Sequence, residues 1–600
     1  MQIAVGVGDD GRVEFVDVAA PDELLAVAVA GAASAREFRR LEAEFGPRWV
    51  WTDVRRWYPS LLASGVRLAR CHDLRLAGAV LGHSTFTADA RARIGRPAPA
   101  WLPPGPTAAT AVLEVDVVPT HEALFDLDDF GGAGLGEQVV APGSPGDDAV
   151  ASRTPSAASV AEEYGRQVAL VASSTAPAAL RLLVAAESAG ALIGAEMRAA
   201  GLPWSRDVHE SVLERELGAR PASGRKPVRM EEVAAVVRSE LGAATLNPDS
   251  QVDVLRALRS AGVPVSSTSR WELREHEHPA IEPLIAYKRL ARLLSANGWA
   301  WLDEWVHDGR FRPEYVPGGT ATGRWATSGG GALQLPKLVR SAVVADPGWT
   351  LVVADAAQLE PRVLTGMARD EAMERAGHDR DLYRGLVDAG VVATRDEAKI
   401  AILGAMYGAT TGDSGRLVPR LSRAFPKAMH LVDRAAFDGE RGTSVTTLLG
   451  RSSPLPPAEW REIQARASQP EATPADERRA RSSARDWGRF TRNFVVQGSA
   501  AEWALCWMAD LRAKLHEIGG RRTDAITPAS ASGPVFAAVP HLVYFLHDEI
   551  IVHTPKVLAD EVADAVRDSA VTAGRLLFGG FPVGFPLDLA VVDSYGAADS

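Results

Sequence analysis

Two apolar segments of this chain carry carboxylates where water is expected to be excluded. In LVVADAAQ, Asp355 follows a fully apolar run, and in VYFLHDEIIV the pair Asp548 and Glu549 is enclosed by large apolar residues. A carboxylate inside an apolar strand is costly to bury unless it is paired or binds a metal. If the two strands are neighbours, their acids converge, and two carboxylate-bridged cations could then carry out phosphoryl transfer.

Two other interpretations of these acids stay open from the residues alone. Each acid could sit at a strand end or in a hairpin turn that faces water, without a chemical role. Paired acids on strands would also suit a nuclease or a phosphatase. The sequence between the two strands therefore has to decide.

A helix predicted between the two strands carries cations along one ridge. In RDEAKIAILGAMYG, which ends at Gly408, the residues Arg395, Lys399, Leu403 and Tyr407 are four apart and fall on one slowly turning line. The two cations at one end suit phosphate oxygens, and the ring at the other end could stack on a base. An amphipathic surface helix with solvated cations would show the same spacing.

The elements that must position these groups follow from the hydrophobic pattern. Over residues 1 to about 125, apolar strands (QIAVGVG, RVEFVDV, WVWTDV) alternate with helical stretches such as ELLAVAVAGAASAREFRRLEAEF, which indicates a small α/β unit. Residues 131–159, rich in Gly, Pro, Ser and Ala, are predicted to be a flexible loop. Apolar residues at three-four spacing predict a helical subdomain from Ala178, and the polar stretch 466–485 is typical of a solvated insertion.

Composition limits the class of protein. A chain of 600 residues with 46% hydrophobic content predicts more than one domain. No uncharged apolar stretch of about eighteen residues and no signal peptide appears, so a cytoplasmic protein is expected. Cys71 and Cys506 stand in unrelated segments, which supports neither a disulfide framework nor a zinc site. The formal net charge of −11 argues against a uniformly basic nucleic-acid coat, although one groove could still be cationic.

The order and wording of these segments resemble the family A DNA polymerases of the DNA polymerase I type, over about residues 180–600. TATGRWATSGGGALQLP is similar to the family segment TGRLSS…LQN.P, and RFTRNFVVQGSAAE is similar to R…N…VQGTAAD. The first likeness implies primer and template contacts near the active site, and the second implies minor-groove and template contacts. The DNA-binding residues implied in this way are Arg324, Gln334, Arg489, Asn493 and Gln497.

Two further motifs imply the metal site. DAAQLEPRVL resembles motif A, DYSQIELR, and LHDE resembles motif C, VHDE. The resemblance implies that Asp355, Asp548 and the backbone carbonyl of Ala356 hold two Mg²⁺ ions, or Mn²⁺ in their place. It also makes Glu549 a supporting acid and puts His547 near the primer terminus.

The resemblance also implies how a nucleotide is held. The predicted helix resembles motif B, R…K…F…YG, whose cations, here Arg395 and Lys399, bind the incoming triphosphate. The lysine of that motif also acts as a general acid toward pyrophosphate. Tyr407 would lie beside the templating base, and Leu403 would pack on the incoming sugar. In motif A, Glu360 would exclude a ribose 2′-hydroxyl.

The chain departs from the family pattern at several positions. Motif A keeps its arginine, Arg362, in a supporting role, but it reads DAAQ where the family usually has DYSQ, so Ala356 and Ala357 lose a ring and a hydroxyl. Leu403 stands where the family usually has Phe or Tyr, and Pro361 stands where it has an aliphatic residue. Sugar selection, processivity and local packing are the properties that these changes would affect.

The N-terminal unit has the size and place of the family's 3′-5′ exonuclease domain, but its catalytic set is incomplete. Asp73 could be the acid of the second motif and Tyr164 belongs to the third, but Val168 stands where the third acid should be, and MQIAVGVG has no DxE. A two-metal exonuclease that lacks most of its ligands should not bind its metals. We therefore expect a degenerate domain kept for structure, without a separate 5′-nuclease domain before it.

The expected fold is α/β and multidomain. A ribonuclease H-like, exonuclease-type domain over residues 1–177 is expected to precede a right-hand polymerase domain over residues 178–600. The palm would contain an antiparallel sheet, and the fingers and thumb would be helical. The expected bounds are about 178–306 for the thumb, about 307–369 and 489–600 for the palm, and about 370–488 for the fingers.

The function that follows is DNA-directed DNA synthesis on a primer-template with dNTPs, for replication or repair, by a monomer at the nucleoid with no membrane partner. A catalytically weak DNA-binding scaffold derived from a polymerase is the alternative, because motif A and position 403 are altered. A nuclease explains neither the cations on the helix of residues 395–408 nor the QGSA segment. All the ionic groups that phosphoryl transfer needs are present, which favours the enzyme.

Overall fold

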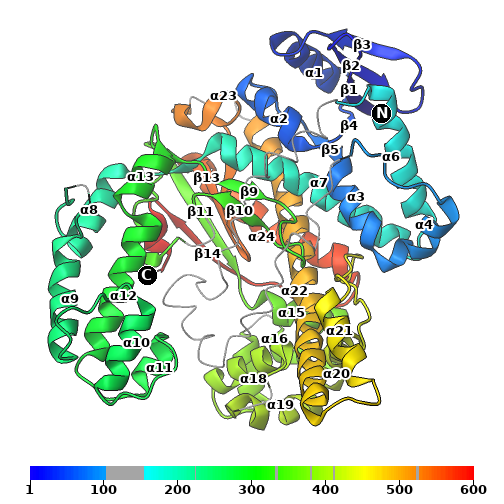
Figure 1. Ribbon diagram of the computed structural model, residues 1–600. Helices are drawn as coiled ribbons and strands as arrows, with labels where there is room; N and C mark the ends of the chain where they lie inside the picture. Colours follow the sequence, from blue (N-terminus) through cyan, green and yellow to red (C-terminus); the bar gives the residue numbers. More distant parts are fainter. Residues whose placement is uncertain are drawn as a thin grey trace.

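The computed structural model consists of an N-terminal α/β unit beside a larger body that is built on a four-stranded sheet (Figure 1). Two groups of helices extend from the larger body, residues 206–297 on one side and residues 371–424 on the other. The structure describes residues 1–102, 154–222, 224–331, 335–378, 381–409, 412–521 and 526–599.

The N-terminal unit is a mixed five-stranded sheet with helices against it. The strands are β1 (Gln2–Val7), β2 (Val13–Asp17), β3 (Leu24–Ala28), β4 (Arg48–Trp51) and β5 (Arg70–Asp73). The helices are α1 (Ala32–Phe45), α2 (Val54–Ala63), α3 (Leu74–His83), α4 (Ala88–Ile94) and α6 (Ala157–Ala172). The strand order is β3-β2-β1-β4-β5, in which β1, β2 and β3 are antiparallel and β4 and β5 continue parallel to β1. Phe15, Phe38 and Trp49 form part of its buried core.

One predicted helix of this unit is only partly helical. The stretch 23–45 forms a helix from Ala32 onward, because Leu24–Ala28 pairs with β2 as an edge strand. Gly31 separates the two elements with a φ of 92°, which a side chain would oppose. Pairing with a free strand edge thus outweighs the helix propensity of Leu and Ala.

The predicted flexible loop over 131–159 is also too long. Ala157 begins α6, and the side chain of Ser156 caps that helix by accepting from the backbone N–H of Ser159. Residues 131–153 of this prediction lie outside the described residues.

A long apolar helix, α7 (Pro177–Ala200), lies between the two bodies. It packs against α2 and β5 on the N-terminal side and against α22 (Pro474–Gly520) of the larger body. By length and composition it is the one described helix that could cross a membrane, but 61% of its most apolar stretch is buried inside the structure. Its apolar surface is therefore used for core packing.

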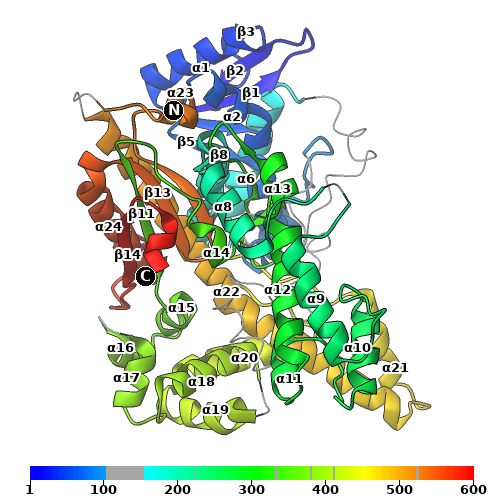
Figure 2. The same ribbon diagram turned by 90° about the vertical axis from the view of Figure 1, so that its left-hand side faces the viewer.

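The helices after α7 form an arm that projects from the larger body (Figure 2). Val254, Leu258 and Leu284 belong to a small apolar core within the arm. The range predicted for the thumb, about 178–306, includes α7, which lies in the central core and outside the projecting arm. The arm consists of α8 (Arg206–Leu217), α9 (Val228–Glu240), α10 (Gln251–Ser260), α11 (Arg270–Arg274), α12 (Ile281–Asn297) and α13 (Trp299–Trp305).

The centre of the larger body is an antiparallel sheet. Its strands are β11 (Trp349–Ala356), β12 (His541–Leu546), β13 (Glu549–Pro555) and β14 (Leu587–Val592), in the order β12-β13-β11-β14. Residues 351–354 of β11 are buried, because the strand has a neighbour on each side and helix α24 (Ala559–Phe578) packs against it. The structure confirms the mixed α/β class that the sequence predicts.

Short strands connect the arm to this sheet. They form two small sheets of order β6-β8-β7 and β10-β9. Their bounds are β6 (Leu202–Pro203), β7 (Val306–His307), β8 (Arg310–Phe311), β9 (Glu314–Val316) and β10 (Ala326–Gly329).

A second helical group follows β11 in the chain. Met373, Ile402 and Met406 belong to its apolar core. The predicted helix from Arg395 forms as α18, with Thr394 as N-cap and Gly408 in the left-handed region at its end. The helices are α15 (Leu359–Ala368), α16 (Glu371–Gly377), α17 (Leu382–Asp388), α18 (Arg395–Tyr407), α19 (Gly412–Ala424) and α20 (Pro426–Glu440). The short helix α14 (Lys337–Arg340) precedes β11 and packs against α8.

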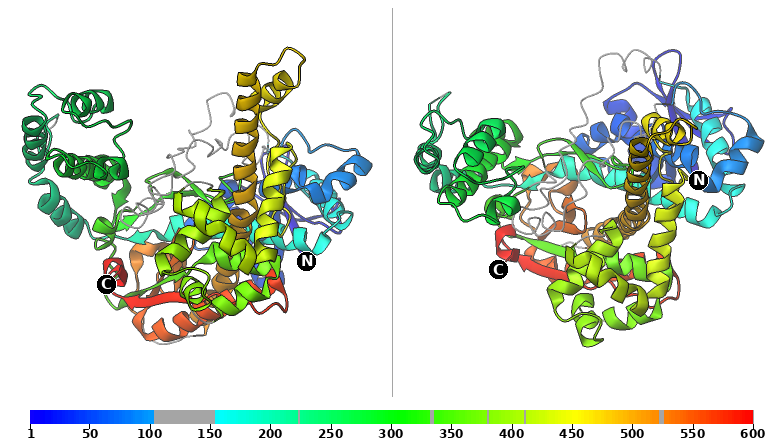
Figure 3. Two further views of the ribbon diagram at one scale, coloured as in Figure 1. Left: turned by 90° about the horizontal axis from the view of Figure 1, so that it is seen from below. Right: turned by 60° about the horizontal axis from the view of Figure 1, so that its bottom comes forward.

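Helix α22 runs for 47 residues through the larger body, and its N-terminal half projects together with α21 (Ala458–Ala467), as Figure 3 shows. The predicted solvated insertion, 466–485, is therefore mostly helical, because Thr473 and Asp476 form a capping box that starts α22. The predicted boundary at residue 489 falls inside this helix. A short helix, α23 (Gly533–Phe536), precedes β12.

A buried charged cluster joins the N-terminal unit to the larger body. Arg512 of α22 donates from Nε to Oε2 of Glu196 in α7 at 2.8 Å and from Nη1 to the carbonyl of Ala69 at 2.6 Å. Tyr58 of α2 donates its hydroxyl to Oε1 of Glu196 at 2.5 Å. Although burial opposes the charge, Arg512 and Arg67 lower the pKa of Glu196. The cluster therefore holds a charged carboxylate between the two bodies.

Replacing Arg512 with alanine is expected to destabilise the protein strongly. The change leaves Glu196 buried without its main partner, which costs about 3–5 kcal/mol. Tyr58→Phe removes a hydroxyl and leaves the ion pair, so we expect a smaller loss of about 1–2 kcal/mol. Thermal unfolding followed by circular dichroism compares the two variants. Equally small shifts of the melting temperature in the two variants would show that the ion pair does not hold the two bodies together.

Candidate functional site

The acids predicted on two strands lie at adjoining strand ends. Asp355, near the end of β11, pairs across the sheet with Glu549, the first residue of β13. The single strand predicted around the second acid is two strands, β12 and β13, joined by a turn at His547 and Asp548. The backbone N–H of Ala356 donates to the carbonyl of Asp548 at 3.0 Å. This bond holds the turn against the end of β11.

Like charges repel one another at this point. Burial, and then the neighbouring charges of Asp548 and Glu549, raise the pKa of Asp355. Burial also raises the pKa of Asp548, and Arg324 opposes that rise. Asp588 of β14 stands opposite Asp355 on the other side and adds to the repulsion. Sequence reasoning missed Asp588, although the apolar alternation around it is typical of a strand. Carboxylates opposite one another destabilise a sheet unless a cation compensates them.

Two residues beside these acids have left-handed backbones. Gln358 has a φ of 57° and His547 has a φ of 58°, a conformation that costs an L-residue about 1–2 kcal/mol. Oε1 of Gln358 accepts from the backbone N–H of Leu382 at 2.9 Å, which links the start of α15 to α17. Strain of this kind persists where the surroundings impose it, and it is common at functional sites.

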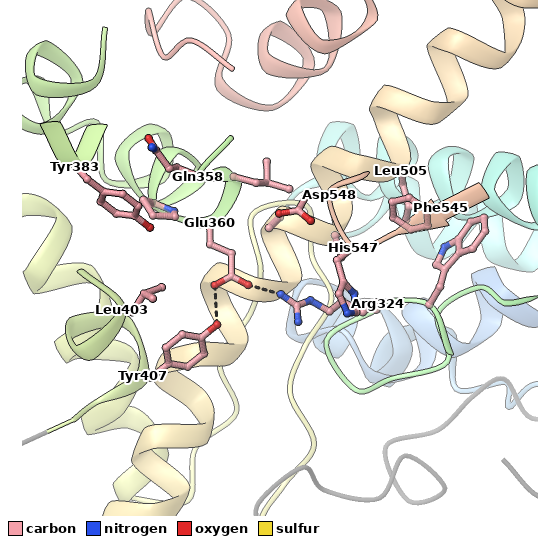
Figure 4. Close-up of a pocket in the computed structure, with 16 residues that line it drawn as sticks. Arg324, Gln358, Glu360, Tyr383, Leu403, Tyr407, Leu505, Phe545, His547 and Asp548 are labelled. Carbon is pink, nitrogen blue, oxygen red and sulfur yellow. Dashed lines mark hydrogen bonds and ion pairs between the residues drawn. The ribbon is translucent and has the colours of Figure 1, made fainter. Parts of the chain in front are cut away.

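A pocket of about 210 Å³ lies beside Asp548 (Figure 4). Its lining comes from the segment before β10, the start of α15, helices α17 and α18, the middle of α22 and the β12–β13 hairpin. Arg324 and His547 lie on one side, and Leu403 and Tyr407 lie on the other. The pocket therefore combines one face of α18 with the turn that carries Asp548.

Glu360 joins the two sides of this pocket. One carboxylate oxygen pairs with Arg324, and the other accepts a hydrogen bond from the hydroxyl of Tyr407 at 3.1 Å (Figure 4). Burial, and then the charge of Glu360, raise the pKa of Tyr407, so the phenol stays protonated and donates. Burial and Arg324 lower the pKa of His547 to about 3. The ring of His547 is therefore neutral at physiological pH.

The predicted phosphate-binding cations do not line this pocket. Arg395, at the start of α18, donates from Nε to Asp381 at 2.9 Å, and its guanidinium lies 5.4 Å from the ring centroid of Tyr383. Half of the Arg395 side chain is exposed, and exposed ion pairs contribute at most about 1 kcal/mol. An anion could therefore replace Asp381. Lys399 stands one turn further along α18, between Arg395 and the pocket.

Arg362 and Glu549 have partners that tie segments together. The guanidinium of Arg362 is buried and donates to three backbone carbonyls at 3.1, 2.9 and 3.1 Å, those of Ala357, Gly377 and Gly584. This side chain therefore braces the loop after β11 against two other segments. Oε2 of Glu549 accepts from the hydroxyl of Tyr595 at 2.6 Å, a contact that the sequence did not indicate.

The DNA-contact residues predicted on α22 lie next to the end of α18. A Cβ at Gly408 would lie 2.9 Å from Cγ of Arg489. Asn493 and Gln497 follow on the same line of α22, and Gln497 is buried. Nε of Arg489 and Oδ1 of Asn493 are buried without a hydrogen-bond partner in the described part of the chain. Buried polar groups in proteins are usually paired, so these two atoms stand out. Gln334 lies outside the described residues.

The fold accommodates the positions where the motifs are altered. Pro361 stands in the first turn of α15, where a backbone N–H has no acceptor within the helix, so proline costs no hydrogen bond. Ala356 is buried, and its N–H is paired as described above. Leu403 gives the pocket an aliphatic surface in place of a ring.

In the N-terminal unit, Asp73 has a structural role as a helix cap. Its Oδ1 accepts from the backbone N–H of Leu76 at 2.9 Å, and its Oδ2 accepts from that of Val54 at 2.8 Å. Burial, and then Asp53, raise the pKa of Asp73. The carboxylate caps α3 and ties it to the start of α2.

The other positions that the sequence analysis compared with exonuclease motifs, on β1 and at Val168, carry no acid. Gly6 of β1 is covered by the start of α6, since a Cβ there would lie 2.2 Å from the backbone nitrogen of Ala157. Tyr164 is buried, whereas Val168 is 45% exposed. An acidic side chain on β1 at Gly6 would therefore meet backbone.

The family model described as DNA polymerase family A matches residues 250–579, which is more than half of the chain. The thermostable DNA polymerase I of Thermus aquaticus is 26% identical over 446 residues, which cover 68% of this chain and 43% of that protein. The DNA polymerase I of Chloroflexus aurantiacus is 27% identical over 350 residues, 54% of this chain and 33% of that protein. The chain spans less than half the length of these relatives.

Among solved structures, the fold is similar to the POL domain of Pol1 from M. smegmatis, which was solved in complex with DNA primer-template and dNTP. The TM-score is 0.61 at 17% sequence identity, and the match covers 99% of this chain and 92% of that chain. At this identity the likeness concerns the fold, and it extends through the N-terminal unit.

Asp355→Asn is expected to stabilise the protein at alkaline pH in buffer with a chelator. The native pKa of Asp355 lies above its ordinary value of 3.8, so the native state holds the proton more tightly, and stability falls as the pH rises through the raised pKa. At about pH 9 the wild-type carboxylate is charged and repelled, and asparagine removes this repulsion. At about pH 3.5 both side chains are neutral, and the difference should vanish. The melting temperatures of the unaltered protein and of the variant are compared at both pH values. An equal difference between the two proteins at both pH values would contradict an electrostatic origin.

Proposed function

The chain belongs to DNA polymerase family A, and we propose on that premise that it is a DNA-directed DNA polymerase. It would add dNTPs to the 3′-hydroxyl of a primer on a DNA template, in replication or repair synthesis. The relatives named above carry the same activity in their names. Their sequences extend well beyond the region that they share with this chain.

One observation carries this proposal. Asp548 lines a pocket whose opposite side is the Leu403 and Tyr407 face of α18, and Asp355 lies at the end of β11, against the turn that carries Asp548. A nucleotide in that pocket would have its base and sugar against α18 and its reacting phosphate near the carboxylates. Phosphoryl transfer is catalysed mostly by positioning and by charge stabilisation, which such an arrangement can supply.

Family A DNA polymerases generally use divalent metal ions, and the residues here fit such ions. The described residues contain no group of three or more His, Cys, Asp and Glu side chains that could hold a metal. Mg²⁺, however, is usually bound by one or two carboxylates together with substrate phosphates and waters. We infer that Asp355, Asp548 and the carbonyl of Ala356 would hold two Mg²⁺ ions, or Mn²⁺. When bound, the ions supply charge stabilisation and activate the attacking hydroxyl.

The side chains around the pocket would hold the nucleotide. Arg395 and Lys399 would bind triphosphate oxygens, Arg395 after release from Asp381, and the ammonium of Lys399 would donate a proton to the leaving pyrophosphate. Glu360, held between its two partners, would exclude a ribose 2′-hydroxyl by its size. Leu403 would pack on the sugar with an aliphatic surface.

The primer-template would be held mainly by side chains of the larger body. Phosphate and minor-groove contacts fix the position of a duplex without reading its sequence. The proposed contacts are Arg324, Gln334, Arg489, Asn493, Gln497 and His547. In this interpretation the four-stranded sheet is the palm, the arm from α8 to α13 is the thumb, and residues 370–488 supply the fingers. We propose a monomer that works in the cytoplasm at the nucleoid.

We also propose that residues 1–177 are an inactive, ribonuclease H-like relative of an exonuclease domain, kept for structure. The capping role of Asp73 and the packing of α6 over Gly6 support this. The buried cluster around Arg512 gives the unit a mechanical reason to be retained, because it ties the unit to α7 and α22.

Purified protein is expected to extend a recessed primer with four dNTPs and Mg²⁺, and Asp548→Asn is expected to slow extension by more than about a hundredfold. Metal-assisted stabilisation of the transition state is worth several kcal/mol, and each 1.4 kcal/mol is about tenfold in rate. Gel electrophoresis of a labelled primer measures extension. Asp593→Asn removes an exposed acid that pairs with Lys556 and serves as the control.

The same gel separates the alternatives. Extension that survives Asp548→Asn would exclude this carboxylate from the mechanism. Duplex binding without extension by the unaltered protein would favour the DNA-binding scaffold. Primer shortening in a lane without dNTPs would contradict the inactive exonuclease-like domain.

Glu360→Ala is expected to admit ribonucleotides. Loss of the side chain opens space beside the sugar, so the preference for dNTPs over rNTPs should fall by about tenfold or more, which corresponds to about 1.4 kcal/mol. Glu360→Gln keeps the size and is expected to keep most of the preference. Single-nucleotide incorporation of dNTP and rNTP by both variants measures this. An equal loss in the two variants would show that charge, and not size, governs sugar selection.

A further inference from the structure

The projecting half of α22 carries a line of arginines on its outer face. Over this half, the buried side chains include those of Ala480, Trp487 and Phe494, which face the neighbouring helices α20 and α21. Arg478, Ser482, Arg485 and Arg489 are spaced by four, three and four residues, which puts them on one line opposite the buried face. We call Arg478, Arg485 and Arg489 the arginine ridge. At 1.5 Å per residue, its members are about 10 Å and 6 Å apart.

The outer two arginines of the ridge are not neutralised by the protein. Arg478 and Arg485 are exposed, and neither forms an ion pair with any residue that the structure describes. Their neighbours differ, because Arg479 pairs with Glu459 at 3.4 Å and Arg481 pairs with Glu477 at 3.3 Å. In a chain of net charge −11, affinity for nucleic acid has to come from local cations such as these.

The inner end of the ridge reaches the candidate site. Arg489 packs against Gly408, which directly follows Tyr407 of the pocket. The guanidinium of Arg489 pairs with Asp486 through Nη2, but its Nε and Oδ1 of Asn493, one turn further, are buried without a partner in the described residues. A nucleotide strand that passed from the pocket onto α22 would offer oxygen acceptors to Nε of Arg489 and base N–H donors to Oδ1 of Asn493, and it would then meet Arg485 and Arg478.

We propose that the arginine ridge binds the phosphates of the single-stranded template ahead of the primer terminus. The proposal rests on the polymerase function, in which Tyr407 lies beside the templating base. The template beyond that base is not yet copied, so it must leave the pocket as a single strand. The ridge begins where that strand leaves, and it offers cations at intervals that suit a phosphate backbone without reading its sequence.

The test compares two primer-templates that share the same duplex. One has a template overhang of about twelve nucleotides, which exceeds the length of the ridge, and the other has an overhang of a single nucleotide. The variant is Arg478→Ala with Arg485→Ala. The control is Arg466→Ala with Arg479→Ala, which removes two exposed arginines from the same helical hairpin. Fluorescence anisotropy gives Kd at several salt concentrations, and single-nucleotide incorporation on the short overhang gives the basal activity.

For the long overhang, we expect the ridge variant to bind more weakly and to show a salt slope smaller by about 1.4, because each single-strand phosphate contact contributes about 0.7. Between about 50 and 200 mM salt, the unaltered protein should then lose about sevenfold more affinity than the variant. Binding to the short overhang, basal incorporation and the control variant should all match the unaltered protein.

Two results would overturn the proposal. An equal loss of affinity on both overhangs would mean that the ridge contacts the duplex, and unchanged binding on both would mean that it is only a solvated helix face. A failure of the polymerase function would look different. Overhang-dependent binding without any incorporation would support the ridge as a single-strand site and would reject the activity proposed for the pocket.

Discussion

Repulsion between carboxylates is the constraint on which the rest of the site depends. Asp355, Asp548 and Glu549 meet where β11 ends and the β12–β13 hairpin turns, and the pKa values of the two aspartates are raised there. Such a group of charges would separate if the strands were free. The apolar interior of the sheet, buried from residue 351 to residue 354, sets a register that the acids cannot change. The burial of the core thus keeps in place an arrangement of carboxylates that a bound cation would stabilise.

Several side-chain contacts hold the segments around these acids in place. Arg362 holds the loop after β11 through three backbone carbonyls, and Glu360 fixes α18 against Arg324. Left-handed backbones at Gln358 and His547 remain because neighbouring segments determine them. Helix α22 is one unbroken element. Its middle lines the pocket and contacts the end of α18, and its N-terminal half projects beyond the body with its arginines. One helix therefore connects the candidate pocket with the surface that we propose for the single-stranded template.

The N-terminal unit is held to the larger body by apolar packing and by buried polar contacts. Asp73 caps a helix, and the start of α6 covers β1 at Gly6. Where the unit meets the larger body, Arg512, Glu196 and Tyr58 form a buried polar cluster. Removing such a unit would expose the apolar face of α7, most of which is buried. Stability therefore supplies a reason to keep the unit.

The amino-acid sequence showed which chemical groups are present and how they repeat locally. The apolar run before Asp355 and the four-residue spacing from Arg395 to Tyr407 could be interpreted directly, because strand and helix periods are local properties. It could not decide the elements that depend on strand pairing. Leu24–Ala28 is a strand because β2 offers an edge, and Asp548 lies in a turn between two strands, which was one of the interpretations that the sequence left open. It also missed Asp588 and Tyr595 as neighbours of the acids. Only the tertiary structure joined Glu360 to Arg324 and Tyr407, residues 36 and 47 positions away, because contacts over such separations leave no pattern in the local sequence.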